Sequence, residues 1–287
     1  MILQRILFRK VTIIGVGLIG GSIGMAIKKK GLARQVVGVS AHASSLECAL
    51  KNEAIDEGTQ DARKSVANAD CVILATPVNT ILTMIDELKD HFRRGTIITD
   101  VGSTKQAIVD RAQRLLPPTV LFVGSHPLAG SEKHGPAFAS ANLFEQTTCI
   151  MTPTDKTNRL AKDKIKHFWT QLGATVKMIF PLEHDEILSY ISHLPHVLAY
   201  AMMKAIPENF LTYAAQGLKD TTRIANSHPS MWVDICLSNP KNVLRSVDET
   251  VKILAQIRKA MVDKDEKQLS EIFQQAREKR QRLEEAV

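Results

Sequence analysis

The chain has 287 residues, with 37 Lys and Arg against 30 Asp and Glu and a formal net charge of +7 at pH 7. Hydrophobic residues make up 44% and charged residues 23%, which is ordinary globular usage and excludes disordered, collagen-like and solenoid classes. This length suits two domains. The basic residues are scattered, which favours a solvated positive surface over a nucleic-acid interface, and such a surface attracts small anionic ligands.

Neither secretion nor membrane insertion is predicted. The opening segment MILQRILFRK is a short apolar run interrupted by Arg5, and no apolar run reaches the roughly 18 residues of a membrane span. We therefore expect a cytoplasmic protein. The cysteines are isolated and lack zinc-type spacing, so we expect reduced thiols and no metal site at Cys48, Cys71, Cys149 and Cys236.

The segment from Val11 to Lys30 has the pattern of a strand, a tight turn and a helix. The β-rich run at 11–14 is followed by three glycines at G-x-G-x-x-G spacing and by apolar residues at helical intervals. In dinucleotide-binding folds the first glycine permits the turn, the second admits a pyrophosphate and the third lets the helix pack on the strand. The alternative is a purely structural turn. We predict a cofactor site at Gly15, Gly17, Leu18, Ile19 and Gly20.

The second predicted strand, 35–39, ends where NAD-binding proteins usually carry an acidic residue for the ribose hydroxyls. Ser40 stands there instead, and the following residues offer hydroxyls and His42 but no carboxylate. Nothing in this stretch repels a 2′-phosphate, and no arginine is present to hold one. We predict NADP rather than NAD as the preferred cofactor.

Strands and helices continue to alternate as far as Pro181. This order predicts an α/β fold with a Rossmann-type, doubly wound parallel sheet, so that residues 1–181 form a dinucleotide-binding domain. The further strands are expected at 70–75, 96–101, 120–123, 148–152 and 175–180, and the helices at 46–52, 78–89 and 159–172.

Ligands in such sheets bind outside the carboxyl ends of the strands. Three consecutive strands therefore aim Thr76, Ser103 and His126 at one crevice. His126 is the candidate base, because imidazole accepts a proton near neutral pH, and Ser103 is expected to orient the base or the substrate by a hydrogen bond. Thr76 and Pro77 are expected to line the cofactor site, with capping of the next helix as the alternative. Glu132 either gates the pocket or faces solvent.

Residues 182–287 show long helical periodicities and no strand pattern, which predicts an all-helical domain for substrate binding and homodimer formation. Arg223 is a candidate anion clamp held by Asp220, and the alternative is a surface ion pair. His193 and His196 are spaced for neighbouring helix faces and lack a zinc pattern, so substrate contact or structural hydrogen bonding is expected. Trp232 is expected in the core or as a pocket wall.

Five motifs, in this order, resemble the prephenate/arogenate dehydrogenase family of tyrosine biosynthesis over nearly the whole chain. They are GVGLIGGSI from Gly15, DVGSTK from Asp100, GSHPLAGSE from Gly124, ISHLPH from Ile191 and KDTTRIA from Lys219. The resemblance implies His126 as catalytic base, Ser103 as its assistant, Arg223 with Asp220 as the substrate-binding pair, and Glu132 as a gate. His193 and His196 match the second histidine motif, and which of them contacts ligand is left open.

The reaction that the resemblance implies is oxidative decarboxylation of prephenate to 4-hydroxyphenylpyruvate, or of arogenate to tyrosine, with hydride transfer to NAD or NADP. Ser40 in place of an acid resembles the NADP-using members. We favour prephenate, or use of both substrates. We expect no mutase or regulatory domain, so that tyrosine would inhibit only at the active site. The alternatives are a β-hydroxyacid dehydrogenase, a pyrroline-carboxylate reductase, or a nucleotide-sensing protein without turnover.

Overall fold

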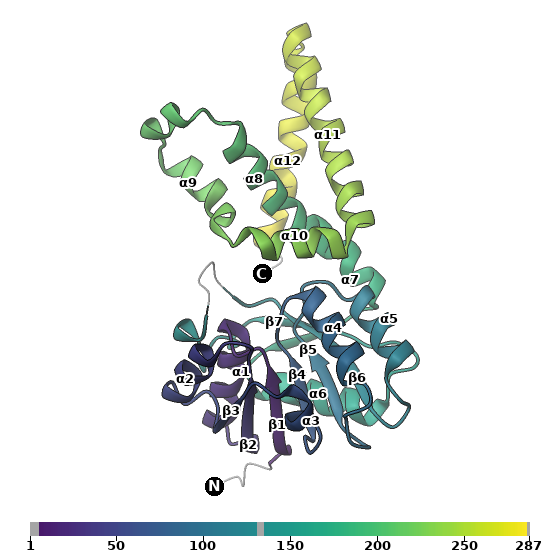
Figure 1. The fold of residues 1–287 in the computed structure, drawn as a ribbon. Helices are drawn as coiled ribbons and strands as arrows, with labels where there is room; N and C mark the ends of the chain where they lie inside the picture. The colour runs from purple at the N-terminus through teal and green to yellow at the C-terminus, as the bar shows by residue number, and fades with distance from the viewer. Residues whose placement is uncertain (1–5, 131–134, 286–287) are drawn as a thin grey trace. The chain divides into compact units, whose positions relative to one another are not determined.

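A computed structural model describes residues 6–130 and 135–285, and Figure 1 shows the course of the chain. The chain divides into two compact units, Met1–Asn239 and Pro240–Val287, which are described separately. The first unit contains the sheet and the helices up to residue 239. The second contains two long helices.

The first unit is built on an eight-stranded sheet in the order β3-β2-β1-β4-β5-β6-β7-β8. The chain runs outward from β1 to β3 and then returns to place β4 beside β1, which is the reversal of strand order typical of a doubly wound sheet. The predicted Rossmann-type architecture is confirmed. The strands are β1 (Phe8–Ile14), β2 (Ala33–Val39), β3 (Glu57–Thr59), β4 (Cys71–Leu74), β5 (Ile97–Asp100), β6 (Leu121–Pro127), β7 (Thr148–Thr152) and β8 (Thr175–Met178).

Helices cover both faces of this sheet (Figure 1). One apolar cluster joins Ile13 of β1 to Ile27 and Trp169, and a second joins Val72 of β4 to Ile81. Burial of each such side chain contributes about 1.5–3 kcal/mol to the free energy of unfolding. Because alternate residues of a strand point to opposite faces, the sheet binds a layer of helices on each face. The helices of this part are α1 (Leu18–Lys29), α2 (Ala43–Lys51), α3 (Ala62–Val66), α4 (Val78–Leu88), α5 (Gln106–Leu115) and α6 (Arg159–Gln171).

The sheet differs from the sequence prediction at three points. β3 was not predicted, because three residues with a central glycine carry no alternating pattern. β7 runs antiparallel to β6, whereas a fully parallel sheet was expected. A parallel return needs a crossover of a dozen or more residues, usually a helix, and the described residues between these strands hold only a short 3₁₀ turn, Pro136–Phe138. Pairing with β7 also extends β6 through His126, which was expected in a loop.

The remainder of the first unit is helical, and three of its helices begin with proline at the first or second position, where no backbone donor is needed. A single π-helical turn, Ser189–His193, joins the first two of these helices. No helix of the described residues is long and apolar enough to cross a membrane. The elements are α7 (Pro181–Leu188), α8 (Leu194–Ala205), α9 (Gln216–Thr222) and α10 (Pro229–Ser238), with 3₁₀ turns at Glu208–Tyr213 and Arg223–Asn226.

The second unit is a helical hairpin of α11 (Pro240–Asp263) and α12 (Glu266–Glu285). Its turn holds Lys264 at φ 54°, and the Asp265 carboxylate accepts a hydrogen bond of 2.9 Å from the Gln268 N–H, which caps α12. The predicted all-helical C-terminal region is confirmed. The division after residue 239 groups α7–α10 with the sheet, so the domain boundary at Pro181 stays a prediction.

Candidate active site

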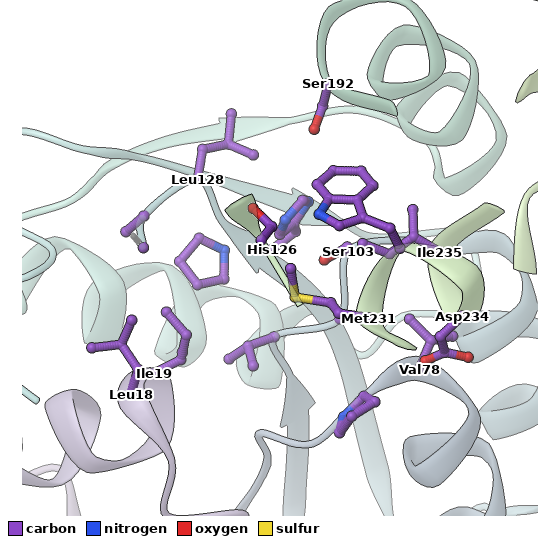
Figure 2. A pocket seen from close by; sticks show the side chains of 18 of the residues that line it. Leu18, Ile19, Val78, Ser103, His126, Leu128, Ser192, Met231, Asp234 and Ile235 are labelled. Atoms are coloured by element: carbon purple, nitrogen blue, oxygen red, sulfur yellow. The ribbon is translucent and has the colours of Figure 1, made fainter. Parts of the chain in front are cut away.

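A cavity of about 710 Å³ lies at the carboxyl edge of the sheet in the first unit (Figure 2). This volume is within the usual range of about 300–1,000 Å³ for small-molecule sites. Its floor comes from the segments that follow four parallel strands, because the carboxyl ends of such strands meet at one edge. After β1 these are Gly17, Leu18 and Ile19, after β4 Thr76 and Pro77, after β5 Gly102 and Ser103, and at the end of β6 His126 to Gly130.

Each of the three glycines in the turn between β1 and α1 has a different structural role. Gly15 has φ 96°, a backbone conformation that residues other than glycine rarely adopt. A Cβ at Gly20 would lie 1.9 Å from the Gly15 carbonyl oxygen, so only glycine lets α1 pack on the turn. A Cβ at Gly17 would meet nothing within 4 Å, and this residue lines the cavity. The backbone at Gly17 is therefore open to close approach by a ligand.

His126 faces the cavity at the end of β6, with Ser103 of the neighbouring loop beside it (Figure 2). The His126 Nδ1 lies 2.9 Å from the Nε2 of His184, so the partner of that nitrogen is His184 and not Ser103. The His184 Nδ1 in turn lies 2.8 Å from the Asp185 Oδ1. Burial, with repulsion from His184, Lys105 and His193, holds the pKa of His126 well below its ordinary value of 6.5. The imidazole is therefore neutral at pH 7 and able to accept a proton.

A buried ion pair fixes the backbone on which this histidine stands. The side chains of Asp100 and Lys105 are fully buried and bonded to each other. The Lys105 Nζ donates to the Ser125 carbonyl at 3.0 Å, and the Asp100 Oδ1 accepts from the Ser125 N–H at 3.1 Å. The carboxyl ends of β5 and β6 are thus tied together directly before His126.

The opposite wall comes from the helical part of the first unit. Arg223, His196 and Trp232 line the cavity, and the His196 and Trp232 rings are stacked with their centroids 3.4 Å apart. The His196 Nδ1 donates to the Ser192 carbonyl at 2.9 Å, which leaves the Nε2 as an acceptor. Burial lowers the pKa of His196, and the charge of Arg223 lowers it further. An arginine and a neutral imidazole therefore face the same cavity.

Two carboxylates from the helical part cap helices of the sheet layer. Asp185 of α7 accepts from the Lys105 and Gln106 N–H groups at 2.7 and 3.0 Å, at the start of α5. Asp234 of α10, which lines the cavity, accepts from the Asn79 N–H at 3.2 Å in the first turn of α4. Neither helix has a side-chain cap of its own. These contacts place both walls of the cavity within one compact unit.

The structure distributes the remaining predicted site residues as follows. Gly15 and Gly20 shape the turn behind the cavity, and Ser40 and His42 follow β2, where the Ser40 Oγ accepts from the His42 N–H at 3.2 Å. Asp220 is exposed, does not line the cavity and accepts a hydrogen bond of 2.7 Å from Gln216. His193 is buried against the edge of the Trp232 ring, outside the cavity lining. Glu132 lies outside the described residues.

Sequence reasoning missed His184 and Asp185 altogether. Both side chains are almost fully buried, at 0% and 2% exposure. They follow His126 by 58 and 59 positions, and a separation of that size forms no recognisable motif in a single sequence. The one usable signal was an adjacent His-Asp pair at the start of a helix, directly after the predicted boundary. Met231 and Ile235, which also line the cavity, had the ordinary spacing of core residues.

The residues present fit a nicotinamide dinucleotide. The space above Gly17 is open, and the buried Thr76 Oγ1 on the cavity wall has no hydrogen-bond partner among the described residues. A buried hydroxyl without a partner costs about 1–3 kcal/mol, so a ligand that bonds to it is favoured. Within residues 6–130 and 135–285, no group of three or more His, Cys, Asp or Glu is arranged to hold a metal ion.

The fold and the site together define a class of enzyme, the oxidoreductases that use a nicotinamide dinucleotide. The fold is a doubly wound sheet with a glycine turn where its strand order reverses, and the site has an imidazole at the end of a neighbouring strand. A model for the prephenate dehydrogenase nucleotide-binding domain matches residues 23–178, and a model for the prephenate dehydrogenase dimerization domain matches residues 180–275. The chain belongs to the prephenate dehydrogenase family.

Relatives of this family match along nearly the whole chain. Prephenate dehydrogenase of Bacillus subtilis is 39% identical over 94% of this chain and 74% of its own length. Cyclohexadienyl dehydrogenase of Zymomonas mobilis is 32% identical over 95% of each. Prephenate dehydrogenase of Aquifex aeolicus, in a crystal structure with hydroxyphenyl propionate and NAD⁺, is 32% identical with a TM-score of 0.89 over 96% of this chain and 98% of that one. The hydroxyacid dehydrogenase, pyrroline-carboxylate reductase and non-catalytic alternatives are not favoured.

Proposed function

We propose that the chain catalyses the NAD(P)-dependent oxidative decarboxylation of prephenate to 4-hydroxyphenylpyruvate, and accepts arogenate as a second substrate. One observation carries the proposal. A neutral, part-buried imidazole at the end of β6 shares a single cavity with the glycine turn on one side and with Arg223 on the other. The names of the relatives, prephenate and cyclohexadienyl dehydrogenase, support this pair of substrates.

His126 is the proposed base. It accepts the proton of the ring hydroxyl while the hydride on the same carbon leaves, which makes that carbon a carbonyl. The carbon–carboxylate bond across the ring then breaks, its electron pair completes the aromatic ring, and carbon dioxide departs. His126 returns its proton to the ring oxygen, so that no net proton is gained or lost. General base catalysis of this kind contributes about 10²- to 10⁴-fold in rate.

The opposite wall is proposed to hold the substrate. Arg223 would bind a carboxylate of prephenate through its planar fork of donors, and the acceptor nitrogen of His196 would meet a substrate hydroxyl or water. Trp232 would cover the ring, since its stacking on His196 presents it to the cavity. Ser103 would donate to the ring oxygen. His196 rather than His193 is the proposed ligand contact, because only His196 lines the cavity.

Three further residues are proposed to serve substrate binding without lining the cavity as it is described. Asp220 would act through Arg223, three positions along the chain, and not by contact with the substrate. His193 would support Trp232 from behind, through their edge-to-face contact. Glu132 would close the cavity, since it follows Gly130 of the cavity lining by two positions. For arogenate, the amino group would need a carboxylate, and among the described residues that line the cavity Asp234 carries one.

The nicotinamide cofactor accepts the hydride when bound. The turn at Gly15, Gly17 and Gly20 would hold its pyrophosphate, Leu18 and Ile19 would pack against it, and Thr76 with Pro77 would line its path across β4. NADP is the proposed preference. Ser40 and His42 replace the usual acid after β2, and the first turn of α2 carries no acidic residue, so a 2′-phosphate meets a helix N-terminus without repulsion.

We also propose two domains, residues 1–181 for the dinucleotide and 182–287 for substrate binding and homodimer formation. The match of residues 180–275 to a dimerization-domain model supports this division. In the second unit, Leu244, Val251, Leu254 and Met261 are all more than half exposed, at spacings of seven, three and seven along α11. Such a stripe is the seam of a helix pair. Light scattering that gives a monomer at micromolar concentration would contradict the dimer. A cytoplasmic location stays a prediction from the sequence.

The test is a four-way assay of the purified chain, with prephenate and arogenate each offered with NAD⁺ and NADP⁺, followed by absorbance of the reduced nicotinamide. We expect turnover of prephenate, slower turnover of arogenate, and a lower KM for NADP⁺. No reduced cofactor in any of the four reactions would overturn the function and favour a nucleotide sensor. A strong preference for NAD⁺ would overturn only the cofactor assignment.

A further inference from the structure

A chain of three side chains runs from the cavity into the protein interior. His126 stands on the cavity wall, His184 is fully buried behind it, and Asp185 is buried beside His184. The two contacts, Nδ1 to Nε2 at 2.9 Å and Nδ1 to carboxylate at 2.8 Å, are hydrogen-bond distances. The two imidazole rings meet edge to face, with centroids 5.2 Å apart. We call these three residues the imidazole relay.

The direction of each bond in the imidazole relay follows from the surroundings of Asp185. Its carboxylate also accepts from the N–H groups of Lys105 and Gln106, and each of these groups can only donate. An ionised carboxylate accepts and cannot donate, so the His184 Nδ1 must carry a proton. Burial lowers the pKa of His184, which keeps that ring neutral with a single proton. The His184 Nε2 is therefore an acceptor.

We propose that His184 and Asp185 select the tautomer of the base: they require His126 to carry its proton on Nδ1, and so reserve the His126 Nε2 as the proton acceptor for substrate. The inference rests on the proposed function, in which His126 is the base. It assigns His184 and Asp185 as positioning residues, which act through His126 and do not touch the substrate.

The imidazole relay also bears on the charged state of His126. Two groups near His126 oppose a positive charge on it. They are Lys105, from the loop before α5, and His193, from the π-helical turn. At His184 the pKa is lowered by burial and by Lys105, while the Asp185 and Asp100 carboxylates raise it in part. When His126 takes up a second proton, its Nδ1–H still has an acceptor in His184, whose own proton points at a carboxylate. The imidazolium is thereby hydrogen-bonded instead of merely buried.

The direct test is nitrogen-15 NMR of the whole protein labelled on histidine, which distinguishes a protonated ring nitrogen from an unprotonated one without any substrate. The His126 signals are identified by their loss in His126→Asn. Two variants follow. His184→Phe keeps an aromatic ring but has no acceptor, and His184→Gln keeps an acceptor oxygen on a side chain of similar reach. His167→Phe, at an exposed position of α6, is the matched control.

We expect His126 to be protonated on Nδ1 in the native protein and in His184→Gln, and to lose this preference in His184→Phe. In His184→Phe we expect kcat for prephenate to fall about 100-fold or more, with cofactor affinity and substrate KM little changed, and His184→Gln to recover part of the loss. A native His126 protonated on Nε2 would overturn the inference, and so would native kcat in His184→Phe. Failure of the proposed function is recognised separately, as absence of turnover by the native protein.

Discussion

The glycine turn allows a comparison of two substitutions that each add one methyl group, at positions three residues apart. Gly17→Ala places a Cβ in open space on the cavity wall, at a φ of −73°, outside the left-handed region that favours glycine. Alanine gains up to about 1 kcal/mol from a less flexible unfolded chain and loses a similar amount as a helix N-cap. We therefore expect the free energy of unfolding to change by less than about 1 kcal/mol, and cofactor affinity to fall steeply.

Gly20→Ala should behave in the opposite way. Its Cβ would lie 1.9 Å from the Gly15 carbonyl oxygen, and α1 would have to move before ordinary contact is restored. Overpacking of this kind costs about 1–3 kcal/mol, set against a gain of up to about 1 kcal/mol in helix propensity. We expect a net loss of stability, seen as a fall of several degrees in the melting temperature.

The assay is thermal unfolding of both variants together with titration of NADPH by its fluorescence. The expected pattern is a stable Gly17→Ala that fails to bind and a destabilised Gly20→Ala. Native affinity for NADPH in Gly17→Ala would refute the reasoning, because it would mean that no ligand approaches the backbone at that position. Equal stability of the two variants would refute the packing role of Gly20.

Four further predictions concern other side chains in or beside the cavity. His126→Asn should lose about 10²- to 10⁴-fold in kcat while NADPH titration still shows binding, and near-normal turnover would exclude His126 as the base. Arg223→Ala should chiefly raise the KM for prephenate, whereas a fall in kcat alone would place the arginine elsewhere in the reaction. Burial lowers the pKa of His193 to about 4, below the ordinary 6.5 of the unfolded chain. The stability that it contributes, up to about 3 kcal/mol, is therefore complete above pH 6.5 and is lost as the pH falls towards 4. Urea midpoints that do not fall over this range would contradict it. Lys105→Met leaves the Asp100 carboxylate buried without its partner and should cost about 3–5 kcal/mol in urea unfolding, and a cost below about 1 kcal/mol would show that other donors suffice.

The sequence alone determined most of the order of strands and helices, the position of the glycine turn, and the three strands whose ends meet at one crevice. These are local or periodic properties: a strand has its own alternation, a turn its own glycine, and the carboxyl ends of parallel strands meet by geometry. His126, Thr76 and Ser103 were found for this reason, and the motif order identified the family. Arg223 was found through its motif.

The tertiary structure alone decided which partners these residues have. The antiparallel β7 depended on the absence of a crossover helix among the described residues, and it extended β6 through His126. His184 and Asp185 are near His126 only in space, because α7 caps α5 across a separation of about 80 positions along the chain. The tautomer of a histidine is set by such contacts, which no spacing in one sequence encodes.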